Sequence, residues 1–197
     1  KLVDFFPEYI TDESDPIKKE IRIRHLLTMS AGFKWNDRGP SMRNWYLSSK
    51  WVKSAIQLPQ ENTPGDIFNY NSSTSHLLSA ILSKSSEIST LDFAKQYLFE
   101  PLGIQSAYWH QDQQGYHIGG FGLGLSARDL AKLGFLYLNN GYWNGRNIVS
   151  ESWVNESTSQ QIQAVSHPIY GKFGYGYQWW VKKVDGCNSF RAWGRRG

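Results

Sequence analysis

Residues 67–82 read IFNYNSSTSHLLSAIL, a strand pattern followed directly by a helix pattern. Residues 67–70 predict a short strand. The next four residues, 71–74, are all favourable helix N-caps. Leucine and isoleucine side chains at positions 77, 78, 81 and 82 then recur at the spacing of one helical face. The stretch therefore predicts a strand-to-helix junction, where the Tyr70 phenol and the Ser72 hydroxyl can point into a cleft.

Helix and strand patterns alternate through the rest of the chain, without a repeat or a linker that would divide it. The predicted helices are 1–9, 25–29 ended by Gly32, 41–56 closed by Pro59, 90–99 stopped by Pro101, a helix capped by Ser126, and 150–154. The predicted strands are 21–24, 173–183 and 189–193, with an Asp185-Gly186 hairpin turn between the last two. The sequence thus predicts a mixed α and β fold with an antiparallel element at its end.

Composition excludes several classes of protein. The chain has 197 residues, 40% hydrophobic and 19% charged, which excludes a highly charged disordered polymer and suits one domain or a large piece of one. Its 21 basic and 17 acidic residues give a net charge of +4, but the basic residues are scattered, which argues against a nucleic-acid surface. The apolar runs are too short for a membrane span. Nine Trp, eleven Tyr and ten Phe can build a core and line a ligand cleft.

Four kinds of chemistry find no support in the motifs. The glycine-rich run 119–124 departs from both phosphate-binding patterns, and we interpret it as a loop that allows close backbone approach. The lone Cys187 excludes a disulfide within the chain and a Cys-based zinc cluster, and the five His residues form no ligand pair. No G-x-S-x-G elbow occurs. A pair of catalytic carboxylates is not excluded, but no acidic residue is singled out. We expect no cofactor and no metal.

Six stretches in one order point to a single family. They are Ile23 to Phe33, Pro64-Gly65 with Phe68 and Tyr70, Leu98 to Ile104, Gly119 to Leu130, Gly174 to Trp180, and Phe190 to Gly194. Together they resemble the serine β-lactamase and penicillin-binding-protein-like hydrolases, in the class C β-lactamase and esterase branch, and within it the aminohexanoate-oligomer hydrolases. The resemblance implies an α/β fold of the α+β type, β-lactamase/transpeptidase-like, with residues 1–197 supplying mainly the helical subdomain and part of the antiparallel sheet.

The resemblance also implies a mechanism. Such enzymes carry a serine nucleophile in S-x-x-K, a Tyr-x-Asn or Tyr-x-Ser motif, and a third K-T-G-like strand motif. The serine forms an acyl-enzyme that water hydrolyses. Tyr70 matches the motif tyrosine and is expected to act as base or proton relay, and Ser72 to bond the lysine or the substrate.

The third motif falls on Trp193-Gly194-Arg195, where Trp193 and Gly194 are expected to border the oxyanion and acyl site. Trp179 and Tyr175 are candidates for the pocket lining, with aromatic packing on a sheet face as the alternative. The expected substrate is a small ester or amide.

Three departures from the family pattern shape the prediction. Ser72 stands where Asn is common in penicillin-recognising members, and the third motif has no Lys, which both favour an esterase or amidase over a β-lactamase. No Ser is followed by Lys three residues later. We therefore expect an internal fragment, inactive alone, whose parent carries the S-x-x-K segment. Family habit favours a periplasmic or secreted parent.

Two other functions stay open. The parent could be a non-catalytic protein of the same fold that holds a peptide or a cell-wall fragment in its aromatic cleft. Nucleic-acid binding is the weaker alternative, because the positive charge is not clustered.

Overall fold

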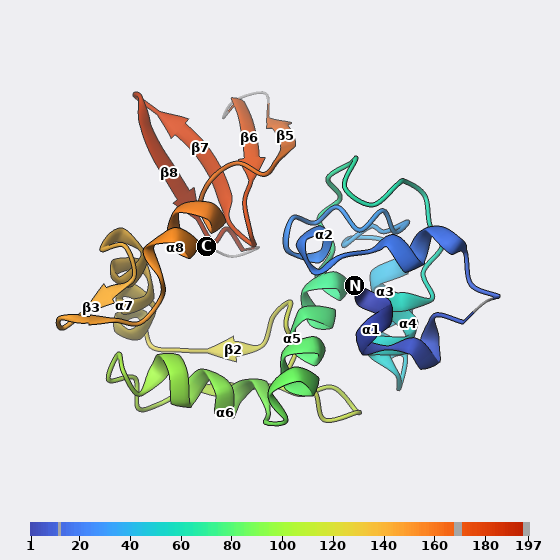
Figure 1. Cartoon of the computed structure of the whole chain (residues 1–197), viewed down its shortest axis with the longest axis horizontal. Coiled ribbons are helices and arrows are strands. Elements are labelled where there is room, and N and C mark those ends of the chain that lie inside the picture. Colours follow the sequence, from blue (N-terminus) through green and yellow to red (C-terminus); the bar gives the residue numbers. More distant parts are fainter. Residues whose placement is uncertain (12, 168–170, 195–197) are drawn as a thin grey trace.

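The computed structural model describes residues 1–11, 13–167 and 171–194. A helical part is built around α5 (Ser72–Ser86), and a four-stranded antiparallel sheet stands at one end of it (Figure 1). On one side of α5 lie α1 (Leu2–Phe5), α2 (Ile23–Leu27), α3 (Pro40–Leu47) and α4 (Trp51–Ile56). On the other side lie α6 (Thr90–Ala94), α7 (Ala127–Leu138) and α8 (Glu151–Ser157). This mixed architecture confirms the predicted fold class.

Short connecting elements complete the chain. They are the 3-10 helices η1 (Pro7–Tyr9) and η2 (Pro16–Glu20), the π-helix η3 (Lys95–Phe99), and the two-residue ladders β1 (Tyr108–Trp109) with β2 (Leu123–Gly124) and β3 (Tyr142–Trp143) with β4 (Arg146–Asn147).

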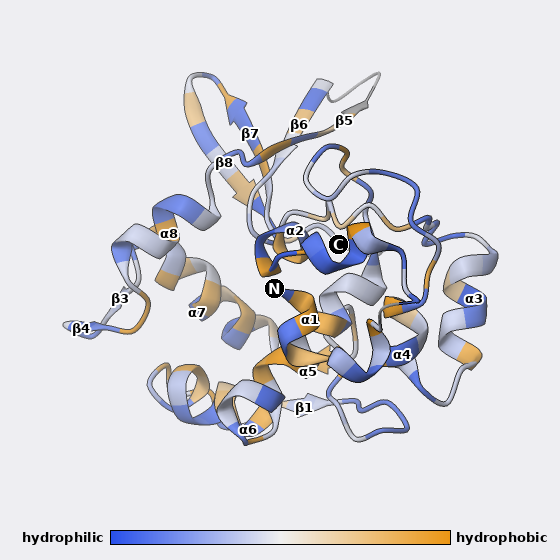
Figure 2. Ribbon diagram, turned by 45° about the vertical axis from the view of Figure 1, so that its right-hand side comes forward, coloured by the Kyte–Doolittle hydropathy of each residue, from blue (hydrophilic) through white to orange (hydrophobic). Residues whose placement is uncertain are grey.

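Helix α5 forms where the sequence predicts it, because its first turn is capped from within. The Asn71 side chain accepts hydrogen bonds from the backbone N–H groups of Ser73 and Thr74 at 2.9 and 3.3 Å. Leu77 and Ile81 on its apolar face are buried, and hydrophobic residues gather on α1 and α5 (Figure 2). The predicted cap and the predicted apolar face are thus both confirmed.

Tertiary packing holds the helices beside α5. Helices α1, α2 and α4 have four, five and six residues, too few for stability in isolation. Their buried side chains join one cluster with α5, and burying each large apolar side chain contributes about 2 kcal/mol. Members of this cluster include Leu2, Phe6, Ile21, Leu26, Phe33, Trp45, Val52, Ile56, Leu77 and Ile81. A second, smaller cluster of Phe99, Leu102, Ile104 and Leu136 joins η3 to α7.

The sheet has the order β5 (Ile162–His167), β6 (Gly171–Tyr175), β7 (Trp180–Val184) and β8 (Cys187–Arg191), all antiparallel. Val184 pairs with Cys187 across the β7–β8 turn, in which Asp185 and Gly186 have φ of 50° and 80°. Positive φ at both central residues is the geometry that Asp-Gly favours in a two-residue hairpin. The predicted hairpin is confirmed, whereas β5 was not predicted. The strand predicted at 173–183 is wrong as a single strand, because a turn at 176–179 divides it into β6 and β7.

The strand predicted at 67–70 is wrong. The segment is irregular, and the backbone N–H of Asn69 donates to the Met29 carbonyl at 2.7 Å. The Asn69 side chain supplies two further bonds, to the carbonyls of Phe33 and Trp35 at 3.3 and 3.1 Å. Hydrogen bonds from a side-chain amide therefore hold this segment in place, where a strand would use backbone hydrogen bonds to a neighbouring strand.

The strand predicted at 21–24 is also wrong, because α2 begins at Ile23. The His25 ring accepts the backbone N–H of Arg22 at 3.2 Å and so stabilises the start of the helix. Gly32 does not end this helix: Met29, with φ of 57°, takes the left-handed position. Gly32 serves a close approach instead, since a Cβ there would lie 2.0 Å from the carbonyl oxygen of Asn62.

Two predicted helices are divided. The 41–56 helix breaks between α3 and α4, where the Ser48 hydroxyl bonds the Ser54 hydroxyl and accepts the backbone N–H of Lys50. Such local side-chain bonds compete with the helix. The 90–99 helix continues from α6 into η3, where the Glu100 N–H donates to the carbonyl of Lys95, five residues earlier. The helices predicted after Ser126 and Ser150 are confirmed, with both serines as N-caps.

Candidate active site

Tyr70 lies half-buried directly before α5. Its ring stacks on the indole of Trp180, at the start of β7, with centroids 5.9 Å apart and planes 16° apart. Its hydroxyl makes no hydrogen bond to any residue that the structure describes. Burial raises the pKa of the phenol, and the nearby Asp37 carboxylate raises this pKa further. The phenol therefore packs on Trp180 and is protonated at neutral pH, and its hydroxyl is unbonded as far as the described residues go.

Ser72 is buried in the first turn of α5 and bound to Asp37. Its hydroxyl donates to Asp37 Oδ2 at 2.8 Å, and its backbone N–H donates to Oδ1 at 3.0 Å. The Trp35 indole N–H also donates to Oδ1, at 2.6 Å. The proton of the Ser72 hydroxyl is thus used within the chain, and its lone pairs remain for any further partner. The role predicted for Ser72 stays a prediction.

Sequence reasoning missed Asp37. The residue lies 35 positions before Ser72, in the loop after Phe33. No motif singles it out, and the Trp35-Asn36-Asp37 run resembles an ordinary polar loop. Only the folded chain brings its carboxylate to the α5 N-terminus, where a negative charge is favourable.

Gly119 and Gly120, which begin the glycine-rich run 119–124, pack directly against the first turns of α5. A Cβ at Gly119 would lie 2.1 Å from the carbonyl oxygen of Ser75, and one at Gly120 would lie 2.8 Å from that of Ser72. No side chain fits at such distances. The interpretation of this run as a close-approach loop is confirmed, and Gly120 brings the loop against Ser72.

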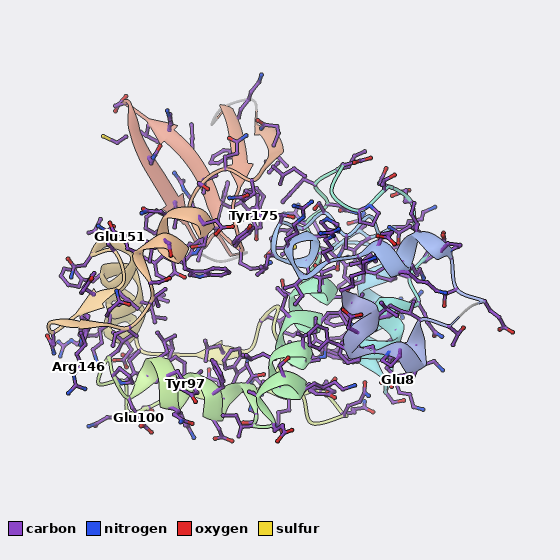
Figure 3. All side chains as sticks on the ribbon, in the orientation of Figure 1. Glu8, Tyr97, Glu100, Arg146, Glu151 and Tyr175 are labelled. Carbon is purple, nitrogen blue, oxygen red and sulfur yellow. The ribbon has the colours of Figure 1, made fainter. Side chains whose placement is uncertain are left out.

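A group of aromatic rings around Trp180 forms a wall beside Tyr70. Its ring contacts Phe68, Tyr175 and Trp193 with centroids 5.5, 5.1 and 6.0 Å away. Tyr175 is buried where β6 meets the helical part near α2 (Figure 3), and burial raises its pKa strongly. Its ring packs among these aromatic residues, against Phe68 and Trp180.

The third-motif residues reach this wall in part. The Trp193 side chain is 44% exposed and also contacts the Phe173 ring at 5.7 Å. Gly194 is exposed directly after it. Arg195 lies outside the described residues. The structure therefore brings Tyr70, Ser72, Tyr175 and Trp193 into one neighbourhood.

Trp179 is not part of that neighbourhood. Its ring contacts Tyr137 of α7 at 4.9 Å and Phe190 of β8 at 5.3 Å. Trp179 ends the turn before β7, and its ring contacts a different set of aromatic residues from the Trp180 ring. The packing alternative describes its position better than a place in the pocket lining does.

Other candidate groups lie elsewhere. His76 Nε2 and Asp112 Oδ2 form a fully buried pair, 3.0 Å apart, that ties the loop 110–118 to α5. Among the described residues, no three His, Cys, Asp or Glu side chains are arranged to hold a metal. None of the described helices has the length and hydropathy of a membrane span. A cavity of about 710 Å³ is lined by residues between Lys34 and Glu61, beside α3 and α4, and Tyr70 is not among them.

Comparison with known proteins finds hydrolases among the similar proteins. A curated 6-aminohexanoate-dimer hydrolase from Paenarthrobacter ureafaciens is 26% identical over 119 residues, which cover 57% of this chain and 30% of that protein. The solved "Putative 6-aminohexanoate-dimer hydrolase from Bacillus anthracis" superimposes with a TM-score of 0.75 at 21% identity, covering 93% of this chain and 52% of that one. A family VIII carboxylesterase gives 0.70 at 15% identity, covering 93% and 60%.

The solved relatives show the fold, and a family model shows the family. The chain spans about half the length of the solved relative, and its match spans less of the curated one. The solved structures share the β-lactamase/transpeptidase-like fold, as the sequence predicts. A family model described as Beta-lactamase matches residues 3–196, nearly the whole chain. The chain therefore belongs to the beta-lactamase family.

Proposed function

We propose that the protein containing this chain is a serine hydrolase that cleaves an ester or an amide bond through an acyl-serine. The observation that carries the proposal is the Tyr70 phenol, which stacks on Trp180 just before α5 and whose hydroxyl has no hydrogen-bond partner within residues 1–11, 13–167 and 171–194. The printed names of similar proteins support it: a 6-aminohexanoate-dimer hydrolase, a D-stereospecific amidohydrolase from Streptomyces and a family VIII carboxylesterase.

In this proposal, the nucleophile and its lysine come from an S-x-x-K segment outside the 197 residues, since no serine within them has a lysine three positions later. The serine oxygen bonds to the substrate carbonyl carbon while its proton passes to the lysine or to Tyr70. The bond to the leaving group then breaks, and the leaving group takes that proton. Water repeats the sequence on the acyl-serine and releases the acid.

The surroundings of Tyr70 suit a proton relay. Burial and the Asp37 charge keep the phenol protonated, so by itself it can donate a proton but is a poor base. An ammonium group within about 4–6 Å would lower the phenol pKa again. We propose that the lysine of S-x-x-K supplies this charge, and that Trp193 and Gly194 border the oxyanion.

The residue at position 72 favours an ester or a linear amide over a β-lactam. An asparagine there would offer two N–H donors, whereas the Ser72 proton is used by Asp37. Ser72 can therefore accept a bond from the lysine ammonium but has no spare donor for a substrate. The absence of Lys in the third motif points the same way.

Labelling with a fluorophosphonate probe, followed by mapping of the modified residue, tests the proposal. The full-length protein should be labelled on one serine, in an S-x-x-K sequence, and should hydrolyse p-nitrophenyl esters or a linear aminohexanoate amide. The 197-residue chain alone should stay unlabelled. A full-length protein without a labelled serine would contradict the proposal and would favour the second candidate, a non-catalytic protein that binds a peptide or a cell-wall fragment.

A further inference from the structure

The turn between β6 and β7, residues 176–179, makes hydrogen bonds to α8 on one side and to α2 on the other. On one side, the Tyr177 N–H donates to the Ser157 carbonyl at the end of α8, and a Cβ at Gly176 would lie 2.1 Å from that oxygen. On the other side, the Gln178 N–H donates to the Leu27 carbonyl at the end of α2, at 3.0 Å. The turn is the place where the sheet joins the helical part (Figure 1).

Gln178 makes most of the second set of contacts. Its side-chain N–H groups donate to the carbonyls of Leu26 and Leu27, in the last turn of α2, at 3.2 and 3.1 Å. The Leu26 carbonyl also accepts the backbone N–H of Met29 at 3.3 Å. Its side-chain oxygen accepts the Ser75 hydroxyl of α5 at 2.9 Å. One amide thus connects α2, α5 and the sheet.

The backbone of Gln178 is held in an unfavourable conformation. Its φ of 64° lies in the left-handed region, which glycine adopts readily and glutamine does not. Residues held in such conformations gather at sites where the surroundings over-determine them. A glycine would adopt this φ with less strain. We therefore attribute the glutamine at this position to the hydrogen bonds of its side chain.

The hydrogen bond between Ser75 and Gln178 joins two segments that both lie beside Tyr70. Ser75 is three residues after Ser72 on α5, and Gln178 is two residues before Trp180, whose indole stacks on the Tyr70 ring. Fixing the distance between α5 and the start of β7 therefore fixes the indole against the phenol. Without the amide, the direct hydrogen bond between this turn and α5 would be lost, whereas the backbone bond to Leu27 and the ring packing would remain.

We propose that Gln178 is a positioning residue for the reaction: its amide sets the Trp180 indole against Tyr70 and so orients the phenol. This inference rests on the proposed function. A displacement of about 1 Å at a reacting group can lower a rate roughly 100-fold. Loss of the amide should therefore lower kcat by about 10- to 100-fold, with KM changed less than about twofold.

The test is a double-mutant cycle in the full-length enzyme with Gln178→Gly and Tyr70→Phe. Gln178→Gly relieves the positive φ and removes the amide, so kcat should fall in the wild-type background. In the Tyr70→Phe background it should change kcat less than about twofold, because the group that it positions is gone. The control is Asp185→Gly, which relieves a φ of 50° in the neighbouring turn and should leave kcat unchanged.

An unchanged kcat in Gln178→Gly, or an equal fall in both backgrounds, would overturn the inference. If Gln178→Gly does not fold, Gln178→Glu takes its place, since it keeps the size but turns a carboxylate towards two carbonyls. Its kcat should be low at neutral pH and recover as the carboxyl is protonated, and a pH profile like that of the wild type would also overturn the inference. If Tyr70→Phe itself has full activity, the proposed function fails and not this inference alone.

Discussion

Ser72 and Asp37 are 35 residues apart in sequence, and two hydrogen bonds join them, from the Ser72 hydroxyl and backbone N–H to the two carboxylate oxygens at 2.8 and 3.0 Å. The pair fixes the first turn of α5 to the loop that follows α2. It also brings a negative charge near Tyr70, which is a cause of the raised phenol pKa after burial. The Asp37 carboxylate thus contributes to the protonation state of Tyr70, after burial, and holds the first turn of α5 beside it.

Replacing that carboxylate should destabilise the protein. Asp37→Ala leaves three donors without their acceptor, the Ser72 hydroxyl, the Ser72 N–H and the Trp35 indole N–H. A buried donor left unpaired costs about 1–3 kcal/mol, so we expect a loss of about 2 kcal/mol or more in the free energy of unfolding, measured with urea. The exposed Asp66, replaced in the same way, should change it by less than about 0.5 kcal/mol. Equal effects of the two variants would show that the Asp37 contacts contribute nothing.

The buried phenol of Tyr175 should make stability fall at alkaline pH. Its pKa is raised in the folded protein by burial, so the unfolded chain releases the proton first as pH rises. The stabilising contribution is complete below the unfolded pKa of about 10 and is lost as pH rises above it. Urea unfolding at a series of pH values should show a smaller alkaline loss in Tyr175→Phe than in the wild type. Parallel curves would contradict the burial of this hydroxyl.

The glycine at 119 should tolerate no side chain. A Cβ there would lie 2.1 Å from the backbone oxygen of Ser75, so Gly119→Ala must displace α5 or the loop. We expect a loss of about 3 kcal/mol in stability, as for other overpacked sites. Gly134, on the exposed side of α7, has nothing within 4 Å, and Gly134→Ala should stabilise by about 0.5–1 kcal/mol. Thermal or urea unfolding of the two variants compares these opposite signs directly.

Local features were predictable from sequence where neighbours in the chain decide the structure. The Asn71 cap of α5, the serine caps of α7 and α8 and the Asp185-Gly186 turn all depend on residues a few positions apart. The strand predicted at 67–70 failed because distant partners decide that segment. Asn69, for example, bonds the carbonyls of Phe33 and Trp35 instead of a neighbouring strand.

The candidate site was predictable only in part, for the same reason. Tyr70 and Ser72 stand in a motif at a helix start, which a sequence displays. Asp37 and Gln178 act through contacts 35 and 103 residues away, to Ser72 and Ser75, and neither lies in a motif that names its role. Trp179 and Trp180 look equivalent in sequence, and only the pairing of β7 decides which of them faces Tyr70.

The acylation rate of the full-length protein with Tyr70→Phe tests the central claim most directly. A fluorophosphonate or an activated ester supplies the acyl or phosphonyl group, and the rate of serine modification is followed by mass spectrometry. Tyr97→Phe, an exposed tyrosine on η3 (Figure 3), serves as the matched control and should keep the wild-type rate. We expect serine modification in Tyr70→Phe to be about 10²–10⁴-fold slower than in the wild type, as for loss of a general base or acid. An unchanged rate would remove Tyr70 from the mechanism and contradict the account.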